Sequence, residues 1–145
     1  MIIVELNSQI IEDFESYEKG NSTLKPDDLL YACHVIEVLG EKYFRKFIET
    51  FCQMVLAPYQ QMYSQQENAT LENTERRYGW IKRKMDEFEG KFGQVFPEYW
   101  GINCFLLYEF CSVTRLHLTM ILERGGGNSN VAILMKSLDL TLKFE

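Results

Sequence analysis

Apolar residues recur at spacings of three and four through most of this chain, and this pattern constrains the fold more than any other feature. The clearest run comprises Leu71, Thr74, Tyr78, Ile81, Met85, Phe88 and Phe92. Such spacing places side chains on one face of an α-helix, whereas no segment alternates apolar and polar residues long enough to indicate a strand. The sequence therefore predicts an all-α fold.

The predicted helices cover most of the 145 residues and are separated by glycine, proline and short polar stretches. The expected ranges are 1–19, 26–39, 41–66, 69–92 and 97–124, with a sixth helix that begins near Asn128 or Ser129 and carries Val131, Leu134, Met135, Leu138 and Leu142. Short connections favour antiparallel neighbours, so the expected architecture is an elongated antiparallel bundle of about six helices.

One proline and two of the helices carry more specific expectations. Pro58 lies inside the third helix and has no N–H for the carbonyl of Met54, so a kink or a break is expected there. The helices over 26–39 and 97–124 are apolar on more than one face, which is typical of helices that neighbours bury. The 97–124 helix, with its repeat from Trp100 through Cys104 to Ile121, is the expected central helix.

The first helix carries a narrow apolar stripe that is already present at the start of the chain. Its members are Ile3, Leu6, Ile10 and Phe14. A narrow stripe is typical of the seam of a coiled coil. We therefore expect residues 1–19 to be the end of a coiled-coil assembly helix that binds partners through these four side chains, and residues 20–145 to form a helical bundle truncated at its C-terminal end.

Charge is distributed unevenly along the chain. The first 72 residues carry 5 Lys/Arg and 12 Asp/Glu, and the others carry 10 and 9. The formal net charge of −6 argues against a generic binder of nucleic acid or anionic lipid. One basic cluster stands out, at Arg76, Arg77, Lys82, Arg83 and Lys84. It is either a docking surface for a phosphoinositide or an acidic partner, or a solvated helix face balanced by neighbouring acids. Trp80, off the apolar stripe, either packs on a second helix or marks an exposed contact.

Few residues suggest chemistry. The four cysteines show no metal-ligand spacing and lie among apolar residues, so we expect them to be small buried side chains in a reducing compartment. Glu5 interrupts the apolar start too early for a signal peptide or a spanning helix. His34 and His117 are expected to be structural histidines. An enzyme would need a buried polar cluster with perturbed titration, and the sequence suggests no residues for one. No catalytic, cofactor-binding or metal-binding residue is predicted.

Three motifs carry a resemblance to a known family. They are ERRYGWIKRK at 75–84, FPEYW at 96–100 and EFCSVTR at 109–115, and the likeness also includes 10–14, 30–33 and 44–59. With these motifs in this order the chain resembles the amino-terminal region of the vacuolar protein sorting-associated protein 53 family over essentially its whole length. It departs from that family at 21–28 and at 125–130.

The resemblance implies a non-enzymatic subunit of the GARP and EARP vesicle tethering complexes. Such a subunit acts in retrograde transport from endosomes to the trans-Golgi network and, in the endosomal complex, in recycling. Its implied partners are sibling coiled-coil subunits, with SNAREs and small GTPases reached through the complex, and its implied place is the cytosolic face of trans-Golgi and endosome membranes, as a peripheral protein. No cofactor or nucleic acid is implied. The alternative is a generic helical scaffold that binds phosphoinositide or an acidic partner through the basic cluster.

Overall fold

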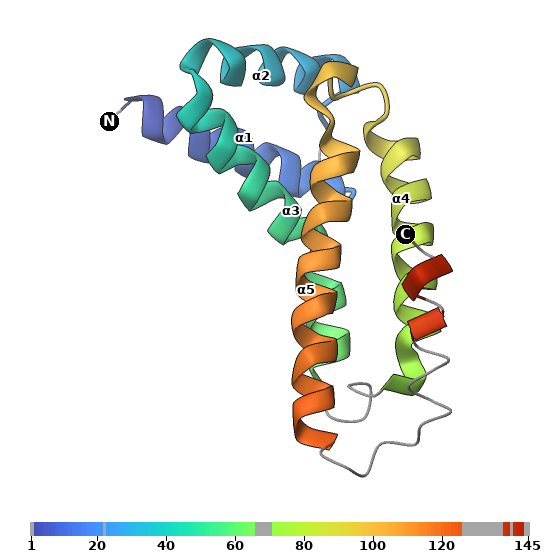
Figure 1. Cartoon of the computed structure of the whole chain (residues 1–145). Coiled ribbons are helices and arrows are strands. Elements are labelled where there is room, and N and C mark those ends of the chain that lie inside the picture. The colour runs from blue at the N-terminus through green and yellow to red at the C-terminus, as the bar shows by residue number, and fades with distance from the viewer. Residues whose placement is uncertain (1, 22, 66–70, 126–137, 140, 144–145) are drawn as a thin grey trace. The chain divides into compact units, whose positions relative to one another are not determined.

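The computed structural model describes residues 2–21, 23–65, 71–125, 138–139 and 141–143 (Figure 1). Among these described residues the ordered elements are helices and there is no strand, which confirms the all-α prediction. The helices are α1 (Ile2–Glu18), α2 (Pro26–Leu39), α3 (Glu41–Ser64), α4 (Thr74–Phe92) and α5 (Ile102–Gly125), with short 3₁₀ turns η1 (Leu71–Asn73) and η2 (Glu98–Trp100). The predicted sixth helix lies outside the described residues except at 138–139 and 141–143, which are helical.

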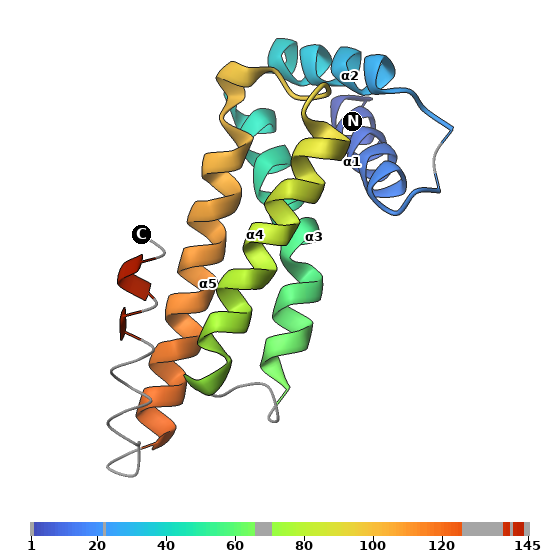
Figure 2. The same cartoon turned by 90° about the vertical axis from the view of Figure 1, so that its right-hand side faces the viewer.

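The chain divides into two compact units, which are described separately. Unit 1 comprises residues 1–55 and 86–106, and unit 2 comprises residues 56–85 and 107–145. Helices α3, α4 and α5 therefore each contribute one part to unit 1 and the other part to unit 2. Figure 2 shows the parts of these three helices that belong to unit 2 running side by side.

Unit 1 is held together by a cluster of aromatic rings. The buried rings are Phe14 of α1, Phe47 and Phe51 of α3, Phe88 and Phe92 of α4, and Phe96 of the following loop. The ring of Phe51 lies edge-on to that of Phe92 at 5.3 Å and to that of Phe96 at 5.1 Å. Edge-to-face ring pairs add about 0.5–1.5 kcal/mol each beyond the area that they bury. This cluster is therefore the main source of packing energy in unit 1.

Helix α2 packs against α1 within unit 1 and begins where the sequence predicts. Pro26 occupies its first turn, and the Asp28 carboxylate accepts a hydrogen bond of 2.9 Å from the backbone N–H of Lys25. The helix ends at Gly40, whose φ of 106° suits glycine. Leu29 and Ile36 are buried, but other apolar side chains of α2 are exposed. The prediction that neighbours bury this helix on all sides is therefore wrong for the described part of the chain.

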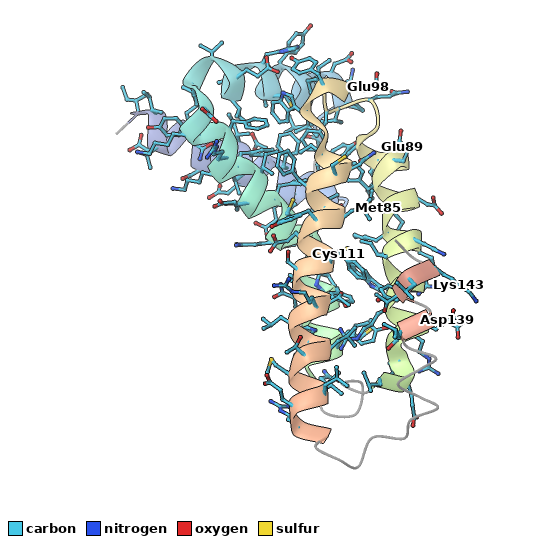
Figure 3. All side chains as sticks on the ribbon, viewed as in Figure 1. Met85, Glu89, Glu98, Cys111, Asp139 and Lys143 are labelled. Carbon is cyan, nitrogen blue, oxygen red and sulfur yellow. The ribbon has the colours of Figure 1, made fainter. Side chains whose placement is uncertain are left out.

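Unit 2 has a mixed aromatic and aliphatic core. Its buried members are Leu56, Tyr59, Tyr63, Tyr78, Ile81 and Phe110. Trp80 packs against this core, with its ring centroid 5.1 Å from that of Tyr59. Of the two roles predicted for Trp80, the structure therefore supports packing on a second helix. Near the end of the chain, Asp139 and Lys143 form an ion pair at 2.9 Å, and both are labelled in Figure 3.

Of the kink or break expected at Pro58, the break does not occur, since α3 is continuous from Glu41 to Ser64, and the kink stays a prediction. Pro58 is exposed, whereas Val55, Leu56 and Tyr59 beside it are buried. The missing N–H therefore falls on the solvent side of the helix, and packing on the other side holds the helix together. A proline can remain inside a helix whose neighbouring turns are fixed by burial.

Helix α5 differs from its prediction in both start and burial. It begins at Ile102 because Gly101 adopts a left-handed φ of 63° after the turn η2, so the chain is not one helix from Pro97. Its buried side chains recur every four residues at Ile102, Leu106, Phe110 and Thr114. Cys104 and Cys111 are exposed, while Cys33 and Cys52 are buried, so the cysteine prediction is right for two of the four.

Many other apolar side chains of α5 are exposed, including Tyr108 at 73% and Leu116 at 60%. It is therefore not the fully surrounded central helix that the sequence predicts. The stretch Glu98–Arg124 is long and apolar enough to cross a membrane by length and composition alone, a property that core helices of soluble proteins share. Because α5 is apolar on all sides, its periodicity does not indicate which side is buried.

Replacing Phe51 by Ala is expected to lower the free energy of unfolding of unit 1 by about 3–5 kcal/mol, because the change empties the centre of the ring cluster. Phe105, which is 43% exposed, is the matched control, and its replacement by Ala should cost less than about 1 kcal/mol. Denaturant unfolding can be followed by Trp100 fluorescence in a Trp80→Phe background, since the chain has 2 tryptophans. Equal costs for the two variants would contradict the central place of Phe51.

Candidate functional site

The four residues of the predicted α1 seam do not form one exposed surface. Ile3 is 44% exposed and Leu6 is 40% exposed, whereas Ile10 and Phe14 are buried in unit 1. Phe14 packs on Phe47 with ring centroids 5.0 Å apart. The second half of the predicted seam thus contributes to the fold of the chain itself, and only its first half is free to meet a partner.

The predicted basic cluster is also divided by the structure. Arg76, Lys82 and Arg83 are exposed and Lys84 is half-buried, but Arg77 has no exposed surface. The basic face of α4 therefore has four members and not five. Binding of a phosphoinositide or an acidic partner by these four residues stays a prediction.

Arg77 lies at the centre of a buried polar cluster in unit 2. Its Nη1 donates one hydrogen bond of 2.8 Å to the hydroxyl of Tyr59 and another of 3.0 Å to Nδ1 of His117. The hydroxyls of Tyr59 and Thr114 are in turn hydrogen-bonded at 2.5 Å. The cluster therefore connects α3, α4 and α5 through one guanidinium group.

Aromatic rings cover the faces of this guanidinium. Its carbon lies 4.5 Å from the ring centroid of Tyr63 and 5.6 Å from that of Tyr59. Within the described part of the chain, Nε and Nη2 of Arg77 have no hydrogen-bond partner. Cation–π contact compensates part of the cost of burying a charge, but the two unpartnered donors make Arg77 an expensive residue for the fold.

The sequence does not predict this cluster, because residue type places Arg77 on a basic surface and suggests no residues for a buried polar cluster. A signal for burial is nevertheless present in the spacing. Arg77 lies three residues after Thr74 and four before Ile81, both of which belong to the apolar stripe of the helix. Its place on that stripe outweighs the usual preference of arginine for the surface.

His117 is held neutral by its surroundings. Burial lowers its pKa, and the neighbouring charge of Arg77 lowers that pKa further. Because a guanidinium can only donate, Nδ1 of His117 must accept, and the neutral ring carries its proton on Nε2. His117 is thus a satisfied structural histidine, as the sequence predicts.

The arrangement supplies hydrogen-bond donors and rings but no acid or nucleophile matched to a base. The charged group of the cluster is Arg77, and its hydroxyls belong to Tyr59 and Thr114. Among the described residues no group of three or more His, Cys, Asp or Glu side chains could hold a metal ion. Burial raises the pKa of Cys33 to about 12, so this thiol stays protonated at neutral pH. The cluster is therefore best explained as packing that fixes three helices.

The FPEYW motif has a structural role in unit 1. Phe96 joins the ring cluster, and the indole N–H of Trp100 donates a hydrogen bond of 2.6 Å to Glu37 of α2. The hydroxyl of Tyr99 donates to the same carboxylate oxygen. These two hydrogen bonds, led by that of Tyr99, lower the pKa of Glu37. The motif thus ties the η2 turn to α2 through one ionised carboxylate.

An all-α chain of this kind, with buried groups devoted to packing and apolar helix faces left open, is typical of proteins that assemble with other helices. The model of the family described as "Vps53, N-terminal" matches residues 1–145, and the chain belongs to that family.

Individual relatives agree with this family. Over 143 residues the chain is 33% identical to Vacuolar protein sorting-associated protein 53 A of Arabidopsis thaliana. This match covers 97% of the chain and 17% of that relative. The chain is 28% identical to the Caenorhabditis elegans homolog, covering 97% of the chain and 18% of that relative. The chain thus spans less than a fifth of the length of these two proteins. No solved structure matches the chain.

Replacing Tyr59 by Phe is expected to destabilise unit 2 by about 1–3 kcal/mol, because it removes the acceptor of a buried charged donor. The matched control is Tyr63→Phe, which keeps the ring over Arg77 and should cost less than about 0.5 kcal/mol. Urea unfolding followed by Trp80 fluorescence in a Trp100→Phe background measures both values. A Tyr59→Phe cost no larger than that of Tyr63→Phe would contradict the cluster geometry.

Unit 2 is expected to lose stability in mild acid. The folded pKa of His117 is lowered from 6.5, so the unfolded chain binds the proton more readily than the folded chain. The contribution of His117 to the free energy of unfolding is therefore complete above pH 6.5, and it decreases as the pH falls from there through the folded pKa. His117→Asn, whose side-chain oxygen keeps an acceptor for Arg77, should flatten the dependence between pH 7.5 and 5. His34→Asn is the control, and an unchanged slope in His117→Asn would contradict this assignment.

Proposed function

We propose that this chain is the assembly region of a vesicle-tethering subunit, and that it joins that subunit to sibling coiled-coil subunits through the start of α1. Membership of the Vps53 family supports the tethering role, and the names of the relatives refer to vacuolar protein sorting. The tethering complex is proposed to be of GARP or EARP type and to act in retrograde transport from endosomes to the trans-Golgi network. The chain itself carries out no catalysis in this proposal.

The observation that carries the proposal is the exposed apolar start of α1. Ile2 is 80% exposed, Val4 is 53% exposed, and Ile3 and Leu6 are exposed on the same two turns. Ile2, Ile3 and Leu6 are neighbours on one side of the helix because they are spaced by three and four residues, and a partner helix that covers them would stabilise the assembly by removing apolar area from water. The name "α1 start" is used below for Ile2, Ile3, Val4 and Leu6.

Asn7 gives the α1 start a polar neighbour. Its side chain is 3% exposed, and its Oδ1 has no hydrogen-bond partner in the described part of the chain. Because this chain itself buries the side chain, Asn7 lies on the inner face of α1 and is not a member of the proposed seam.

The proposed cellular setting follows from the complex and not from the chain alone. The subunit would act on the cytosolic face of trans-Golgi and endosome membranes, with SNAREs and small GTPases as partners of the assembled complex. The alternative, in which the basic face of α4 binds phosphoinositide, has less support than the sequence suggests because Arg77 is buried.

Charging the α1 start should separate the chain from its siblings. In the full-length subunit co-expressed with the other subunits, Ile3→Glu with Leu6→Glu is expected to reduce co-purification at least about tenfold, since a charge in a helix seam loses both burial and pairing. Leu122→Glu, at an α5 residue that is 41% exposed, is the matched control and should leave co-purification unchanged. Unchanged co-purification of the doubly charged variant would refute the proposed role of the α1 start.

A further inference from the structure

Helix α2 presents a second unpartnered apolar surface in unit 1. Tyr31, Val35 and Val38 are 67%, 38% and 86% exposed. They are spaced by four and three residues and so lie on one face of the helix, opposite the buried Leu29 and Ile36. Val38, at the end of this stripe, is 86% exposed, so the fold of the chain does not remove its apolar side chain from water.

The η2 turn holds a second exposed tyrosine beside α2, next to this surface. Tyr99 is 74% exposed, and its hydroxyl donates a hydrogen bond to Glu37, the residue before Val38. This hydrogen bond holds an exposed aromatic ring beside the helix in a fixed position. Tyrosine is enriched at the energetically important positions of protein interfaces, because it buries a large rigid area at a small cost in side-chain entropy. The name "α2 patch" is used below for Tyr31, Val35, Val38 and Tyr99.

Acidic side chains surround the α2 patch. Asp27 and Asp28 lie in the first turn of α2, the carboxylate of Glu37 is ionised next to Val38, and Glu98, labelled in Figure 3, precedes Tyr99. Lys25 caps the start of α2 and His34 lies three residues after Tyr31, so the acidic side chains outnumber the basic ones here, and neither α2 nor η2 contains a lysine or an arginine. The patch therefore has an apolar centre and a rim that is predominantly acidic.

We propose that the α2 patch docks an amphipathic helix of another protein, one whose apolar stripe is flanked by Lys or Arg residues. Helix-in-groove recognition uses side chains at the spacing that Tyr31, Val35 and Val38 present. A basic flank on the partner complements the acidic rim and selects it over other apolar helices.

The same rim disfavours two other occupants of the α2 patch, a second copy of this chain and an anionic membrane. A second copy of this chain docked through the α2 patch would bring acidic rim against acidic rim, which costs free energy. An anionic membrane surface would repel the rim for the same reason. The patch lies on a different helix from the α1 start, so the two proposals stand or fall separately.

Three labelled helical peptides test the proposal against the 145-residue chain. The first has leucines at the spacing of three and four, flanked by lysines. The second has the same composition in scrambled order, and the third keeps the stripe but has glutamates in place of the lysines. Fluorescence anisotropy measures affinity, and amide chemical shifts locate the contact. We expect the first peptide to bind at least about tenfold more tightly than the other two, with shifts at the α2 patch.

Variants of the chain complete the test. Val38→Glu, at a side chain too exposed to affect folding, should weaken binding of the first peptide at least about tenfold. Leu116→Glu on α5, at a side chain that is 60% exposed, is the matched control and should leave the affinity unchanged. Equal binding of striped and scrambled peptides, or shifts away from α2, would overturn the proposal. The proposal would also be overturned if the chain formed a dimer, or floated with phosphatidylserine vesicles, and Val38→Glu abolished that association.

Discussion

One line of buried side chains on α3 supplies both cores of this chain. Phe47, Phe51, Val55, Tyr59 and Tyr63 recur every four residues and are each at most 5% exposed. The first two hold the aromatic cluster of unit 1, and the two tyrosines hold the core of unit 2. Helices α1, α4 and α5 each place an aromatic ring against this line, through Phe14, Phe92 and Phe110. Pro58 is tolerated because it lies outside this line, at an exposed position.

Periodicity predicted the helices best where only one of their faces is apolar. On α4, the stripe through Tyr78, Ile81 and Phe88 is the one that is buried, since charged residues occupy the other faces. On α5 the same reasoning selected Cys104 and Cys111, which are exposed, because apolar residues surround that helix and several stripes fit equally well. The start of α5 was also misplaced, since the left-handed turn at Gly101 depends on a backbone angle and not on hydrophobic pattern.

The buried cluster shows a different limit of sequence reasoning. Residue type assigned Arg77 to the surface, although its spacing from Thr74 and Ile81 places it on the buried stripe. The partners that make its burial tolerable, Tyr59 and His117, come from positions 18 residues before it and 40 after it. No local pattern links residues so far apart, so only the fold reveals that one guanidinium joins three helices.

In its described residues, this member of the Vps53 family is a helical chain with a packed interior and exposed apolar side chains on α1, α2 and α5. Hydrogen exchange of the full-length subunit, alone and with its siblings, tests that claim most directly. We predict that the backbone amides of residues 5–9 at the start of α1 exchange at least about tenfold more slowly in the complex, because a partner helix suppresses opening of those turns. Equal exchange of these amides in both states, while the complex is intact, would contradict it.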